Sequence, residues 1–159
     1  MTLLRTLAMG VAALLVGSVS ADDKKPDFDA AKLIGKWTVT AGIKDGAEAK
    51  PEGTVVLFDK EKLTLKTPIG DFVMKYTIDA KVTPVAIDLE ITESPDPEAK
   101  GAKSKGIISV EGDTLKLSYR PKGGDRPKDF AAKKGTGEYS FTTKKAKEDK
   151  KEDKKEDKK

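Results

Sequence analysis

Hydrophobic and polar residues alternate along most of this chain from Trp37 onward. In the runs Lys62–Lys66 and Val85–Ile91, every second residue is a large apolar one. A period of two places successive side chains on opposite faces of a β-strand. The alternation predicts eight strands, at residues 37–41, 54–58, 62–66, 72–78, 85–91, 107–110, 115–119 and 139–141.

The same alternation predicts which side chains point into the core. In the first strand it places Trp37, Val39 and Ala41 on one face, with Lys36, Thr38 and Thr40 on the other. One face of each later strand is also mostly apolar. The residues predicted to point inward include Trp37, Leu65, Met74, Tyr76, Leu89, Leu117 and Phe141.

Short turns or loops join these segments, and no long amphipathic helix separates them. Parallel βαβ units are therefore excluded. An antiparallel meander of eight strands removes its exposed edges when it closes into a barrel. The interior of such a barrel is filled by side chains or holds one small ligand. We predict an all-β fold, an eight-stranded antiparallel up-and-down barrel, with an open two-sheet sandwich as the alternative.

The N-terminal residues have the features of a targeting segment. Arg5 precedes an apolar run at 7–17, and Val19-Ser20-Ala21 follows, which predicts a secretory signal peptide at 1–21 with cleavage after Ala21. The run is shorter than the ~20 residues that a spanning helix needs, and no other stretch could span a bilayer. We expect an exported protein, periplasmic or secreted, without an integral membrane span.

The remaining boundaries follow from composition. Residues 22–30 form a polar leader, and 28–34 read as one or two helical turns, capped by Asp27 or Asp29 and ended by Gly35. The barrel domain spans 31–143. Residues 144–159 repeat Lys, Glu and Asp without a large apolar side chain, which predicts a disordered tail.

The positive charge of the chain belongs mainly to that tail. The net charge is +4, but residues 22–143 contain 21 basic and 21 acidic residues. A basic face that would bind nucleic acid is therefore not expected on the barrel. Lys144 to Lys159 carry a net +3, which is enough for weak contact with an anionic envelope surface.

The chain contains no cysteine and no histidine. This composition excludes zinc sites built on those residues, thiol nucleophiles and serine–histidine pairs. An exported domain without disulfides must be stabilised by its core alone, and the chain is long enough for one such domain. We expect no metal and no cofactor.

Four short motifs resemble those of a known family. In order, they are Leu33-x-Gly35-x-Trp37, Pro84-x-x-Ile87-Asp88-Leu89, Gly112-Asp113-x-Leu115-x-Leu117 and Arg126-Pro127-x-x-Phe130. Together with the short helix and the meander, they resemble the lipocalin and calycin superfamily, and most closely the uncharacterised exported lipocalin-like domains common in planctomycetes. The resemblance covers residues 31–143. It implies a barrel plugged at one end by the tryptophan, with an arginine across it, and implies no established activity.

Several inward-facing residues are candidates for lining a ligand cavity. Aromatic, methionine and hydroxyl-bearing side chains suit a small apolar cavity, although they suit a filled core equally well. Trp37 is either a plug or a ligand contact, and Arg126 either binds an anionic group or stacks and ties down its loop. The candidate ligand-binding residues are Trp37, Phe72, Met74, Tyr76, Tyr119, Arg126 and Tyr139; the structural motif residues are Gly35, Trp37, Pro84, Asp88, Arg126 and Pro127.

Asp88 and Glu90 form a carboxylate pair on one strand face. Such pairs can perform acid–base chemistry or hold calcium, but the spacing also describes the solvated face of an amphipathic strand. We expect the solvated face, and therefore no catalysis.

Two functions remain open. The first is an exported, non-catalytic, lipocalin-like domain that binds a small apolar ligand in its barrel. The second is a structural or protein-interaction module of the cell envelope, with a filled barrel and a weakly adhesive tail. The size of the interior distinguishes them, because ligand pockets begin at about 300 Å³.

Overall fold

The computed structural model describes residues 28–49, 51–121 and 123–146. The predicted signal peptide at 1–21, its cleavage site, most of the leader at 22–30 and the tail from 147 to 159 lie outside the described residues.

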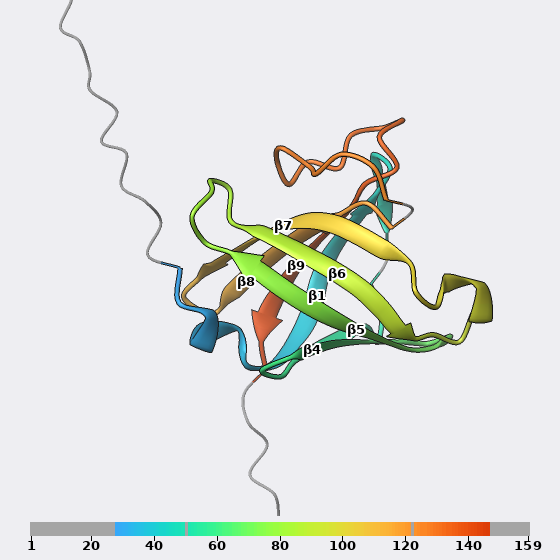
Figure 1. Ribbon diagram of the computed structural model, residues 1–159, viewed down its shortest axis with the longest axis horizontal. Coiled ribbons are helices and arrows are strands. Elements are labelled where there is room, and N and C mark those ends of the chain that lie inside the picture. Colours follow the sequence, from blue (N-terminus) through green and yellow to red (C-terminus); the bar gives the residue numbers. More distant parts are fainter. Residues whose placement is uncertain (1–27, 50, 122, 147–159) are drawn as a thin grey trace, which may run out of the picture.

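The described residues form nine strands and two single 3-10 turns (Figure 1). In chain order their bounds are η1(Ala30–Leu33), β1(Gly35–Lys44), β2(Ala47–Ala49), β3(Val55–Phe58), β4(Lys62–Thr67), β5(Gly70–Asp79), β6(Ala86–Glu93), η2(Pro97–Ala99), β7(Lys103–Glu111), β8(Thr114–Tyr119) and β9(Tyr139–Lys145).

Eight of these strands close into a barrel. Neighbouring strands pair in the order β1-β3-β4-β5-β6-β7-β8-β9, and β9 returns to pair with β1, from Trp37↔Lys145 to Lys44↔Tyr139. Every pairing is antiparallel. The predicted up-and-down barrel is confirmed, and the open sandwich is excluded because β1 and β9 leave no free edge. Strand β2 lies beside the far end of β1 as a small hairpin arm.

The core lies inside the barrel and follows the predicted period of two. Of the residues predicted to point inward, Trp37, Leu65, Met74, Leu89 and Leu117 are buried, while Tyr76 and Phe141 pack against the same cluster. The first strand departs from the prediction. A bulge between Val39 and Ala41 shifts the register, so that Ala41 is exposed and Gly42 is buried opposite Phe141. One extra residue in a strand exchanges the faces beyond it.

A short turn before β1 resembles the predicted helix but is a single 3-10 turn. The Asp29 carboxylate accepts a hydrogen bond from the backbone N–H of Ala31 at 2.9 Å, as a capping residue does. Gly35 follows with a φ of 127°, a conformation that favours glycine.

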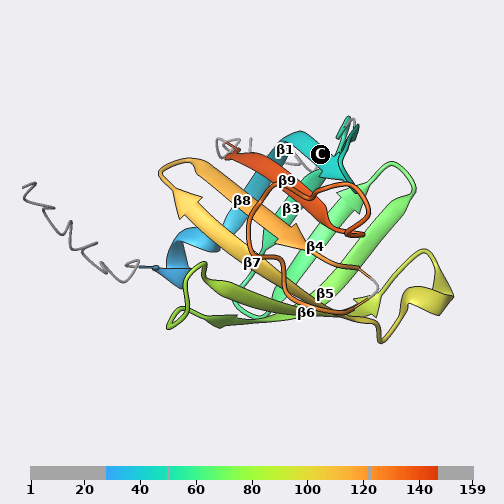
Figure 2. The same ribbon diagram turned by 90° about the horizontal axis from the view of Figure 1, so that it is seen from above.

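The long segment between β8 and β9, residues 120–138, lies against the outside of the barrel (Figures 1 and 2). We call it the outer loop; its position 122 is not described. Pro127 and Ala132 are buried within it. Beneath the loop, Ile107 and Ser118 form a cross-strand pair on the outer face, and both are buried. The outer loop therefore gives the barrel a second, smaller buried layer.

The last strand corrects one predicted boundary. Lys144 and Lys145 were assigned to a tail at 144–159, but both belong to β9. The Lys145 N–H donates to the Asp113 carbonyl at 2.9 Å, and the Ala146 N–H donates to the Lys36 carbonyl at 2.8 Å. The composition of this stretch concealed the strand, because its order comes from backbone pairing with β1 and β8 and not from apolar side chains.

A pair of truncations tests this boundary. A chain that ends after Thr143 is expected to be at least about 1–2 kcal/mol less stable than one that ends after Ala146, since the backbone pairing of Lys144 and Lys145 with β1 and β8 is lost. Urea unfolding of the two variants measures the difference. Equal midpoints would show that the end of β9 contributes nothing to stability.

None of the helical segments within the described residues has the length and apolar character needed to cross a bilayer.

Candidate functional site

One end of the barrel is closed by Trp37. Its indole Nε1–H donates to the carbonyl oxygen of Leu33 at 2.7 Å. Both side chains are 0% exposed, and the 3-10 turn η1 lies at this end (Figure 1). A buried indole with its N–H satisfied by a neighbouring carbonyl is a structural plug.

The cation over this tryptophan is a lysine. The family resemblance implies an arginine packed across the ring, but Lys145 Nζ lies there, 5.3 Å from the ring centroid. Arg126 and Arg120 both lie elsewhere: Arg126 on the outer face of β6 and β7, and Arg120 in an ion pair with Glu138 at 3.0 Å. The charge composition predicts that Lys145 belongs to the tail, so the sequence does not indicate that this lysine lies over the tryptophan ring.

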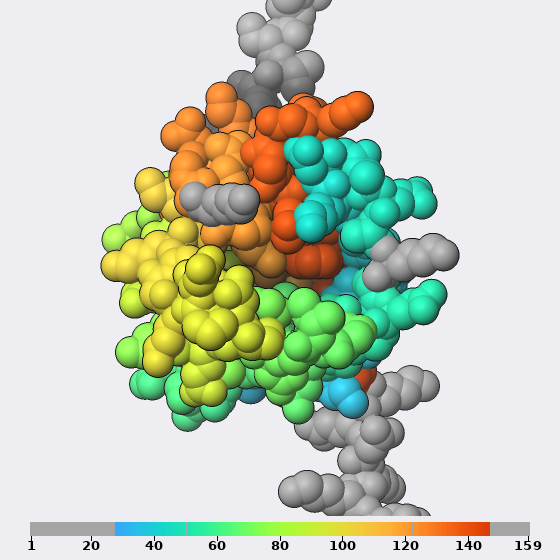
Figure 3. Space-filling view, turned by 90° about the vertical axis from the view of Figure 1, so that its right-hand side faces the viewer, coloured from blue at the N-terminus to red at the C-terminus, as the bar shows by residue number. Residues whose placement is uncertain are grey.

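The opposite end of the barrel is open. A cavity of about 610 Å³ extends into the barrel from this mouth. Figure 3 looks at this end and shows a hollow bordered by the β6–β7 loop, the β4–β5 turn, the β1–β2 hairpin and the start of β9. The rim of the cavity includes the turn η2 and the exposed side chain of Ile69.

Apolar and aromatic side chains dominate the cavity wall. Four of the predicted ligand-binding residues line it: Phe72, Met74, Tyr119 and Tyr139. The other lining residues are Lys44, Leu65, Thr67, Ile69, Ile91, Asp96, Glu98, Ala99, Ala102, Ser104, Pro121 and Phe141. This composition suits a mostly apolar ligand that carries a few polar atoms.

Three predicted ligand-binding residues do not line the cavity: Trp37, Tyr76 and Arg126. Trp37 is the plug described above. Tyr76 packs edge-on against Phe58 at 5.5 Å between centroids, and its hydroxyl donates to the Asp59 carbonyl at 2.6 Å. Burial, with a smaller contribution from the charge of Asp59, raises the pKa of Tyr76.

Arg126 holds the outer loop on the barrel. Its Nη1 donates to the carbonyls of Ile87 at 3.0 Å and Gly106 at 2.6 Å, and its Nη2 donates to Asp88 Oδ1 at 2.7 Å. Two of the sequence motifs are thereby joined, the one that contains Pro84 and Asp88 and the one that contains Arg126 and Pro127. Of the two roles considered for Arg126, these contacts favour tying down the loop, since a guanidinium donates in several directions at once.

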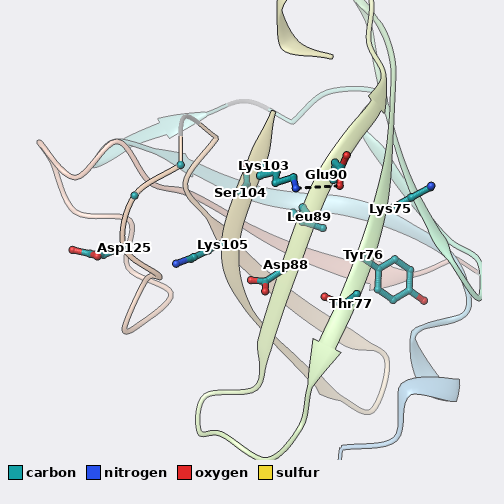
Figure 4. A pocket seen from close by; sticks show the side chains of 12 residues that line it. Lys75, Tyr76, Thr77, Asp88, Leu89, Glu90, Lys103, Ser104, Lys105 and Asp125 are labelled. Atoms are coloured by element: carbon teal, nitrogen blue, oxygen red, sulfur yellow. Dashed lines mark ion pairs between the residues drawn. The ribbon is translucent and has the colours of Figure 1, made fainter. Parts of the chain in front are cut away.

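The carboxylate pair lies on the outer face, in a shallow groove of about 790 Å³ between β5, β6, β7 and the outer loop (Figure 4). Asp88 is engaged by Arg126, and Glu90 lies 3.9 Å from Lys103 Nζ. The sign of the charge alternates from one segment of the groove to the next. The side chains are Lys75 on β5, Asp88 and Glu90 on β6, Lys103 and Lys105 on β7, and Asp125 on the outer loop. Opposite charges on a solvated surface are typical of ordinary sheet faces. No three metal-ligating side chains gather within the described residues.

Three of the polar side chains that line the cavity form one row at its mouth. Lys44, Tyr139 and Tyr119 are register partners on the adjacent strands β1, β9 and β8. Lys44 Nζ lies 5.0 Å from the Tyr139 ring centroid, and the two tyrosine rings are 5.9 Å apart. Interaction with the Tyr139 hydroxyl raises the pKa of Lys44. Burial raises the pKa of Tyr119, and Tyr139 adds to this effect. At neutral pH the amine is charged and the Tyr119 hydroxyl is protonated.

Sequence reasoning missed the contribution of Lys44 to the cavity. Had the period of two continued unbroken from Trp37, position 44 would face outward. A signal was present in Asp45-Gly46, which is a two-residue hairpin turn of the kind that extends a strand pair. That turn indicates that the first strand continues to Lys44, but it does not reveal the bulge.

Comparison with known proteins gave no match, whether with protein-family models, curated proteins or solved structures. The family resemblance therefore remains a prediction, while the closed eight-stranded barrel that it implies is present.

Proposed function

We propose that this protein is an exported, non-catalytic, lipocalin-like barrel that binds a small, mostly apolar molecule in its interior. The observation that carries the proposal is the cavity of about 610 Å³, open at one end and closed at the other by Trp37. Its volume lies within the range of about 300–1,000 Å³ typical of ligand pockets.

The alternative, an envelope interaction module, rests on a filled barrel, and the cavity argues against a filled interior.

The proposal gives no chemical role to Asp88 and Glu90. Both carboxylates lie on the outer face, outside the cavity lining, and each is close to a cationic side chain.

The mouth of the cavity offers a position to block. Ala102 lines the cavity two residues before the buried Ser104, where a larger side chain would occupy the entrance. Ala102→Trp is expected to weaken binding of the neutral fluorescent probe N-phenyl-1-naphthylamine by at least about tenfold. The reason is that the indole would take up part of the apolar surface that the probe buries. Fluorescence titration of the full chain measures the affinity.

The matched control is Thr77→Trp, which places the same side chain on the exposed outer face of β5. It is expected to bind the probe as the unmodified chain does. Thermal unfolding of both variants verifies the fold. Failure of the unmodified chain to bind any apolar probe, or identical binding by the Ala102→Trp variant, would count against the cavity as the site.

A further inference from the structure

The mouth of the cavity carries one polar row above apolar ones. Lys44, Tyr139 and Tyr119 occupy matching register positions on three adjacent strands. The next inward-facing positions on the same strands are Gly42, Phe141 and Leu117, which are also register partners. The lining therefore changes from polar to apolar between the first row and the second. A ligand that enters from the mouth would pass the polar row first.

Within the described residues, the hydroxyl of Tyr119 has no hydrogen-bond partner. Its side chain is 9% exposed and lines the cavity, and no hydrogen bond joins its hydroxyl to any other residue in the described ranges. Tyr119 lines the cavity, so its hydroxyl can donate a hydrogen bond to a group that is bound there.

A cation lies on the same row, two strands away from Tyr119. Lys44 is exposed at the rim, and none of the ion pairs of the described residues includes it. An ammonium group only donates hydrogen bonds, and a protonated tyrosine hydroxyl can donate as well. The row is therefore matched by a ligand group that accepts from both. Hydrogen bonds to an ionised acceptor are roughly twice as strong as those to a neutral one.

The acidic residues of the mouth lie on another segment. Asp96 and Glu98 belong to the β6–β7 loop, and Figure 3 shows this loop across the hollow from the β1–β2 hairpin. The Asp96 carboxylate already accepts from the Glu98 N–H at 3.0 Å, where it caps η2. Their negative charge disfavours an anion on that side of the mouth and so favours the Lys44 side.

We propose that the ligand is an amphiphile with an anionic head group, held at the mouth by Lys44, Tyr139 and Tyr119 with its apolar tail among Leu65, Phe72, Met74 and Ile91. This inference rests on the proposed function and adds the chemical class of the ligand. The carboxylate of a fatty acid has the required chemistry.

A matched pair of ligands tests the head group separately from the tail. Laurate and lauryl alcohol have the same chain, and each is titrated below its aggregation concentration against the probe N-phenyl-1-naphthylamine bound to the full-length protein. Laurate is expected to displace the probe at about tenfold lower concentration, the effect of one added charge-assisted hydrogen bond.

Substitutions in the polar row test whether Lys44 and Tyr119 cause the preference for laurate over lauryl alcohol. Lys44→Met is expected to remove the preference for laurate over lauryl alcohol, and Tyr119→Phe to reduce that preference several-fold. Lys105→Met is the control, because it removes an exposed lysine that lines the outer groove and not the cavity. It is expected to leave both affinities unchanged.

The outcomes separate the two proposals. If the probe and both ligands fail to bind, the proposed function fails and this inference fails with it. If both ligands bind equally well, the cavity is a site for apolar molecules, but the anionic head group is excluded. A laurate preference that persists in the Lys44→Met variant would also overturn the inference.

Discussion

Trp37→Ala is expected to lower the free energy of unfolding by about 3–5 kcal/mol, the range for a large aromatic side chain truncated in a core. The indole is 0% exposed, closes one end of the barrel and donates to the Leu33 carbonyl. Its removal would leave a large void, an acceptor without its donor and no ring beneath Lys145. Denaturant unfolding followed by circular dichroism measures the loss, because the chain has no other tryptophan.

Two further variants show what the side chain contributes. Trp37→Phe keeps an aromatic ring but removes the donor to Leu33, and is expected to cost less than the alanine variant. Lys36→Ala changes an exposed neighbour on the same strand and is expected to have little effect. A loss below about 1 kcal/mol for Trp37→Ala, the central value for ordinary substitutions, would mean that Trp37 is not the plug of the barrel.

Gly106→Ala is expected to cost about 2–3 kcal/mol, as for overpacking of a tightly packed interior. Gly106 faces inward on β7. A Cβ atom there would lie 2.6 Å from the Ser118 carbonyl oxygen, 2.9 Å from Tyr119 Cβ and 3.2 Å from Ile87 Cγ2. The nearest of these atoms belongs to the backbone of β8 and cannot move without disturbing the β7–β8 pairing. The Gly106 carbonyl also accepts from Arg126, so the outer loop would be displaced as well.

Urea unfolding measures this cost, and Ser109→Ala on the same strand is the control, since it removes only a partly buried hydroxyl. Because the added methyl group presses on Tyr119, the Gly106→Ala variant should also bind apolar probes with altered affinity. A variant as stable as the unmodified chain would show that β7 and β8 can separate locally at little cost, contrary to the close approach seen here.

The cavity was partly predictable from sequence. Phe72, Met74, Tyr119 and Tyr139 lie on the inward faces that the period of two assigns, and all four line the cavity. The pattern could not decide whether the barrel was filled, because the same side chains suit a packed core and a cavity wall. It also assigned Tyr76 to the cavity, whereas its position near Phe58 and Asp59 depends on how far each strand is shifted along the barrel axis.

Arg126 illustrates a second limit of sequence reasoning. Its three acceptors come from β6 and β7, and the partners are 20 to 39 residues away along the chain. Asp88 looked like half of a carboxylate pair with Glu90 because the two are neighbours in sequence. In the folded protein its partner is Arg126, since the outer loop returns over the strand face on which Asp88 lies.

Alternation by itself determined the all-β class, the number of barrel strands and the inward face of most of them, because a half-buried strand must repeat its polarity every two residues. Charge composition assigned residues 144–159 to a tail, and tertiary structure corrected this at Lys144 and Lys145, whose order comes from backbone hydrogen bonds to neighbouring strands. Three features depend on the tertiary structure alone: the bulge that turns Lys44 inward, the position of Lys145 over Trp37, and the cavity at the open end of the barrel. Each depends on interstrand register and on the packing of distant segments, which the local sequence pattern does not contain.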